Sequence, residues 1–182
     1  MSSQRSPMVM RHAGRFVRPL CAVLYYGHVY ATRETRPMTA LSPDAALSNL
    51  MILVHPHMAR LDAEFAQWRS IGTWAIVSIG RELAAAATKD SADRRAMLAR
   101  DALNAAILTS QAETVLCTDL APLFDPTWHI DALALFAQLA RQRRLVLLWP
   151  GSYHEGVLSC ATPEHAHHRT WPNPDAVVIP LR

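Results

Sequence analysis

The stretch from Thr114 to Gly151 constrains the fold more than any other part of this chain. It contains an apolar run that ends in an acid (VLCTDL), a short loop (APLFDP), an amphipathic segment and a second apolar run (RRLVLLWPG). Strand, helix and strand in this order form the unit of a parallel sheet, because parallel strands need a crossover connection. The acid, Asp119, follows the first strand, where open α/β sheets bind their ligands.

The same alternation continues on both sides of this stretch and predicts the rest of the fold. Helices are predicted at three places with helical apolar spacing: 58–69, 81–110 with a break near 89–91, and 129–142. Strands are predicted where short apolar runs occur: 50–54, 73–79, 115–120, 145–149, 176–181 and an edge strand or hairpin arm at 156–160. The pattern indicates a three-layer α/β/α sandwich with a mostly parallel sheet, P-loop NTPase-like in its order of elements. Right-handed crossovers would place the carboxyl ends of the strands at 50–54, 115–120 and 145–149 along one edge, which would carry His55, Asp119 and a WPG turn at 149–151. Prolines at 163, 172 and 174 mark the segment between the last two predicted strands as loop.

The turn after the first predicted strand decides between function classes. P-loop NTPases hold a magnesium-binding aspartate at a strand end such as that of Asp119. Their phosphate-binding turn reads G-x-x-x-x-G-K-[ST]. Its glycines let backbone N–H groups wrap a phosphate, its lysine neutralises charge, and its hydroxyl binds magnesium. In this chain the corresponding residues read HPHMARLD.

Each of the specialised P-loop positions is altered. His55 and Arg60 occupy the two glycine positions, where side chains would obstruct the wrap. Leu61 occupies the lysine position and cannot neutralise a phosphate, and Asp62 at the hydroxyl position would repel one. We therefore expect an ordinary strand-to-helix turn in this degenerate nucleotide-binding segment. Two further members complete the segment: Pro56, which would end the strand, and His57, which with His55 could approach a ligand.

The acids after the third predicted strand allow two interpretations. Asp119 and Asp125 bracket the loop that follows the strand, and two carboxylates at a strand end could hold magnesium. Asp125, in F-D-P-T-W, is also a typical turn or helix-cap residue. We favour the cap for Asp125 and keep Asp119 as the magnesium candidate.

Two other groups of side chains each allow two interpretations. Arg141, Arg143 and Arg144 lie near the carboxyl end of the helix predicted at 129–142, where positive charge is favourable, and with Trp149 they could also contact a partner. Four residues of types that bind zinc occur close together in the tail: Cys160, His165, His167 and His168. Their spacing matches no zinc finger, so we favour a solvated loop over a metal site.

Composition limits the class of protein. The chain has 182 residues, of which 51% are apolar, enough for one domain with a substantial core. We expect no membrane span, because no apolar run approaches the ~20 residues that a span requires. The three cysteines are odd in number and far apart, which favours reduced thiols and a cytoplasmic protein.

The net charge of +3 is unevenly distributed. Residues 1–37 contain six arginines and one acid, whereas residues 38–182 contain twelve basic and fourteen acidic side chains. The first segment therefore reads as a basic, poorly ordered extension, and 38–182 as the single α/β domain. A secretory signal and a nucleic-acid-binding or lipid-binding arm are alternatives for 1–37.

Three blocks of the sequence resemble BrxF, the small P-loop-containing protein of some BREX phage-defence systems. They are L-F-D-P (123–126), R-Q-R-R-L-V-L-L-W-P-G (141–151) and L-S-C-A-T-P-E-H (158–165). The resemblance extends back through I-V-S-I-G-R-E-L-A (76–84) to I-L-V-H-P (52–56). It implies an ASCE-type P-loop fold with a Walker A turn after the first strand and acids after the third.

The family's nucleotide-binding residues do not carry over to this chain. The Walker A glycines and lysine are unmatched at His55, Arg60 and Leu61. If L-F-D-P sets the register, the acid expected before it falls at Ala121, which leaves Asp119 as the nearest acid.

We therefore expect a non-catalytic accessory protein without a cofactor, which acts through other defence-system proteins. One alternative is a weak or partner-completed ATPase, with ATP and with magnesium on Asp119. Another is a nucleic-acid-binding accessory that uses the arginine-rich N-terminus.

Overall fold

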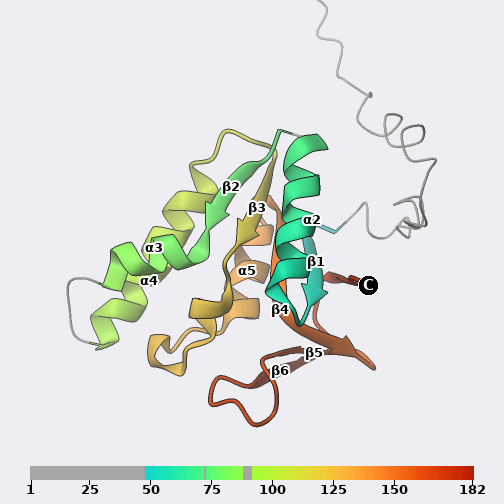
Figure 1. The fold of residues 1–182 in the computed structure, drawn as a ribbon. Helices are drawn as coiled ribbons and strands as arrows, with labels where there is room; N and C mark the ends of the chain where they lie inside the picture. The colour runs from blue at the N-terminus through green and yellow to red at the C-terminus, as the bar shows by residue number, and fades with distance from the viewer. Residues whose placement is uncertain (1–47, 72, 88–91) are drawn as a thin grey trace, which may run out of the picture. The chain divides into compact units, whose positions relative to one another are not determined.

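The computed structural model describes residues 48–71, 73–87 and 92–182. The predicted extension at 1–37, its boundary with the domain and the helix break near 89–91 lie outside these ranges. Within them the chain alternates strands with helices and short 3-10 turns (Figure 1). The elements in chain order are β1 (Leu50–His55), α2 (Met58–Ile71), β2 (Ala75–Ser78), α3 (Ile79–Ala87), α4 (Ala92–Leu108), β3 (Thr114–Thr118), η4 (Ala121–Phe124), η5 (Pro126–Trp128), α5 (Ala132–Ala140), β4 (Arg144–His154), β5 (Val157–Cys160), β6 (Arg169–Pro172) and β7 (Val177–Pro180).

Five strands pair in parallel in the order β2-β3-β4-β1-β7. β4 lies at the centre, where Leu147 is opposite both Ile52 of β1 and Cys117 of β3. A central parallel strand is covered on both faces, and this explains the unbroken apolar run LVLLW. The mixed α/β architecture with a mostly parallel sheet, predicted from the sequence, is confirmed.

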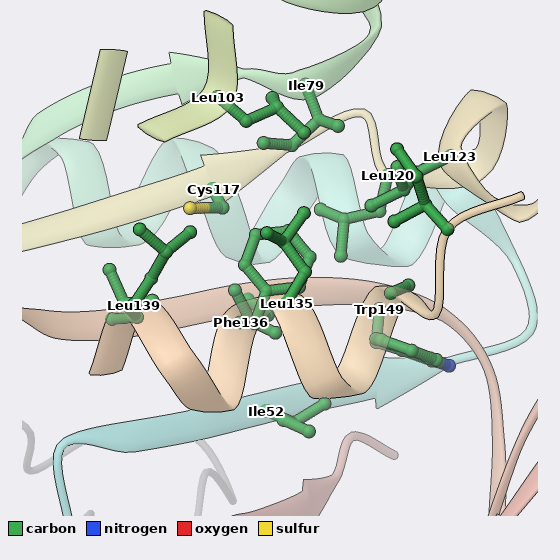
Figure 2. Packing of buried hydrophobic residues seen from close by; sticks show 14 of the residues in the cluster. Ile52, Ile79, Leu103, Cys117, Leu120, Leu123, Leu135, Phe136, Leu139 and Trp149 are labelled. Carbon is green, nitrogen blue, oxygen red and sulfur yellow. The ribbon is translucent and has the colours of Figure 1, made fainter. Parts of the chain in front are cut away.

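Helices cover both faces of the sheet, so alternate residues of each strand enter different hydrophobic clusters. Ile52, Cys117 and Leu147 belong to the larger cluster, which also takes in buried residues of α3, α4 and α5. Figure 2 shows side chains of α3, α4 and α5 in this cluster, with Leu103 of α4 next to Ile79 of α3. The smaller cluster lies under α2, and this helix contributes Leu61 and Trp68 to it.

The segment before α5 differs from the prediction of one helix over 129–142. The 3-10 turns η4 and η5 precede α5, which begins only at Ala132. Asp125 caps η5 by accepting a hydrogen bond from the Thr127 N–H at 2.8 Å, and Asp131 caps α5 by accepting one from Ala134 N–H at 3.0 Å. Two separate caps with Pro126 between them divide the segment, because each starts a new turn.

β4 is longer than predicted and contradicts the expected WPG turn at 149–151. The strand continues through Pro150 to His154 and pairs antiparallel with β5, which in turn pairs with β6. Gly151 permits this, because a Cβ there would lie 1.9 Å from the Ser159 carbonyl oxygen. The expected hairpin arm at 156–160 is therefore β5, and the tail predicted as loop contains β6.

In the ranges that the structure describes, no helix is long and apolar enough to cross a membrane.

Candidate functional site at the carboxyl edge of the sheet

The connection from β1 to α2 consists of only Pro56 and His57. The His57 N–H donates to Nδ1 of His55 at 3.0 Å, and the two imidazole ring centroids lie 5.4 Å apart. The His57 carbonyl accepts from Arg60 N–H at 3.1 Å, so helical bonding starts at once. A P-loop places four residues between its two glycines, and this chain uses the equivalent residues as turn and first helical turn.

The side chains at the P-loop glycine and lysine positions have other partners. Arg60 Nε donates to the Arg182 carbonyl at 2.8 Å, and its Nη1 lies 3.4 Å from Glu64 Oε2. Leu61 is 1% exposed and packs in the cluster beneath α2. Asp62 is exposed on the same helix. On α2, Arg60, at the position of the second P-loop glycine, therefore points towards Arg182. Leu61, at the position of the P-loop lysine, points into the core.

Asp119 directly follows β3 and has a left-handed backbone conformation, with φ of 55°. Its carbonyl accepts from Gly80 N–H at 3.1 Å, and its carboxylate lies 3.5 Å from Ser78 Oγ. A Cβ on Gly80 would meet this carboxylate at 2.0 Å, so the side chain rests against the first turn of α3. Negative charge is favourable at a helix N-terminus, which gives Asp119 a structural role that needs no metal.

Gly80→Ala should lower stability by less than about 1 kcal/mol, because the new methyl group displaces the exposed Asp119 carboxylate from the helix N-terminus, while alanine itself favours the helix. Asp119→Gly removes that carboxylate and suits the positive φ, so the double variant should recover most of the loss. Urea unfolding of the four proteins measures this coupling. Additive losses would show that the two residues do not interact.

β4 separates the candidate residues along the carboxyl edge. His55 is opposite Pro150 of β4, and Asp119 follows the strand on the other side of β4. Neighbouring strands lie about 4.8 Å apart, so the turn with His55 and His57 lies two strand spacings from Asp119. β4 lies between them and extends beyond both to His154. His55 and Asp119 therefore lie on opposite sides of β4, and the WPG segment expected beside them is part of that strand instead of a turn.

The proposed partner-contact residues differ in availability. Trp149 is 0% exposed, and its ring packs on Phe124 and Trp171. Its Nε1 donates to the Ser159 carbonyl at 2.9 Å. The prediction that Trp149 contacts a partner is therefore wrong. Arg143 donates to the carbonyls of Leu108, Ser110 and Ala112. Arg141 and Arg144 are exposed.

The histidine-rich loop is held by its own backbone. His165 Nδ1 accepts from His167 N–H at 3.1 Å, and the Cys160 thiol donates to the His167 carbonyl at 3.2 Å. Across the described ranges, no three His, Cys, Asp or Glu side chains form a group that could hold a metal ion. His165, His167, His168 and Cys160 thus shape the link between β5 and β6.

Electrostatics at this edge follow hydrogen bonding and burial. The Thr127 backbone N–H, with smaller contributions from His167 and Arg169, holds the pKa of Asp125 below its usual value. Burial raises the pKa of the Cys117 thiol to about 12, and burial also raises that of Cys160. Neither thiol is therefore an activated nucleophile.

Sequence reasoning did not single out Asp131. This residue caps α5 and also accepts from Trp171 Nε1 at 3.1 Å, which fixes β6 against the helix. Its position just before an apolar helical stripe is the signal that could have identified it.

Comparison of the chain with protein-family models, with curated proteins and with solved structures finds no match.

Proposed function

We propose that this chain is a non-catalytic protein of P-loop-like fold, whose degenerate nucleotide site is closed and which acts by binding protein partners. The strand order supports the fold. ASCE-type P-loop proteins place one additional strand between the strand with the Walker A turn and the strand with the Walker B acid. Here β4 lies between β1, with the HPHMARLD turn, and β3, with Asp119.

The two-residue connection between β1 and α2 carries the functional half of the proposal. A phosphate-binding turn needs several consecutive N–H groups that face one point and a lysine beside them. In this chain the His57 N–H bonds to His55 and Arg60 bonds to Arg182. Leu61, which stands where a P-loop has its lysine, is buried in the hydrophobic cluster beneath α2. This arrangement supplies neither the space nor the charge that a triphosphate requires.

The competing ATPase places magnesium on Asp119. The carboxylate of Asp119 is directed to Ser78 and to the first turn of α3, two strands away from the β1 turn. Two strand spacings also separate the Walker A turn from the Walker B acid in ASCE-type proteins, so what disfavours the ATPase is the β1 turn, which offers no phosphate site beside such an acid. The geometry therefore favours a partner-binding role over hydrolysis.

The biological setting follows from the resemblance to BrxF alone. We place the chain among the accessory proteins of BREX-type phage defence, in which its partners would be other components of the same system. The nucleic-acid-binding alternative depends on the arginine-rich segment 1–37, outside the described residues.

Calorimetry with ATP and magnesium tests the proposal. We expect no saturable heat at ligand concentrations up to about 1 mM, which corresponds to a binding free energy weaker than about −4 kcal/mol. Asp119→Ala serves as the paired variant and should give the same flat titration. A micromolar dissociation constant that is lost in Asp119→Ala would overturn the proposal and support the ATPase.

A further inference from the structure

We draw no further inference here: the strongest candidate, the exposed face of the antiparallel β4–β5–β6 arm with Val157 and the aligned hydroxyls of Ser152, Ser159 and Thr170, carries none because nothing in the structure shows what covers it.

Discussion

Replacing Leu61 by lysine should strongly destabilise the protein and should not create ATPase activity. The substitution places a lysine where a P-loop would carry one, but the side chain at this position is 1% exposed and packs with Leu53, Leu116 and Leu148. An unpaired ammonium group in an apolar cluster is costly, and the leucine contacts are also lost. We expect a loss of roughly 3–5 kcal/mol, a large share of the about 5–15 kcal/mol that holds a typical domain folded.

Urea unfolding measures the loss, and a phosphate-release assay measures hydrolysis. Leu61→Met is the matched control, because it keeps the volume and polarity of the site and should cost less than about 1.5 kcal/mol. ATP hydrolysis by Leu61→Lys, or stability equal to that of the natural sequence, would contradict the position assigned to this residue.

Truncating Leu147 to alanine should produce the second large loss. Leu147 is 0% exposed and lies in the middle of β4, between Ile52 on β1 and Cys117 on β3. Removing its side chain loses buried apolar surface and leaves a cavity in close-packed surroundings, so we expect roughly 2–5 kcal/mol of destabilisation. The melting temperature should fall by roughly 5–15 °C for a domain of this size.

Ile76→Ala provides the comparison for Leu147→Ala. Ile76 lies on the edge strand β2 and is 38% exposed, so its truncation should cost much less. Calorimetric melting of both variants checks the difference. Equal losses would mean that β4 is not the central strand of the folded sheet.

The sheet could be predicted because its strands carry apolar runs that tolerate few alternatives. LMILV and LVLLW are buried on both faces, and their predicted limits differ from β1 by one residue and from the start of β4 by one residue. α2 was predicted at its first residue, since Leu61 and Trp68 repeat at helical spacing. Such patterns reflect burial, which the sequence records directly.

The β-strand extension at the end of β4 could not be predicted in the same way. Pro150 and Gly151 are turn residues in most sequences, and WPG was interpreted accordingly. The structure uses Gly151 for the close approach of the Ser159 carbonyl, a contact between strands that local composition does not reveal. β6 was missed for a related reason: Arg169–Pro172 has little apolar character and pairs only with β5.

The candidate site was predicted as a set of residues but not as an arrangement. The sequence identifies what His55, Arg60 and Leu61 lack for binding phosphate. It does not reveal that Arg60 bonds to the Arg182 carbonyl, because that contact joins residues from opposite ends of the domain. The sequence also placed Trp149 at a partner surface, whereas packing against Phe124 and Trp171 buries it.

Amide NMR of the labelled protein during titration with ATP and magnesium tests the closed β1–α2 turn most directly. The signals of 57–62 report on the backbone N–H groups that a P-loop would direct to a phosphate. If the two-residue turn is closed as described, these signals should not move in a saturable manner, and sodium triphosphate should give the same result. Saturable shifts confined to these residues would show that the turn accepts a phosphate, and would contradict the proposed function.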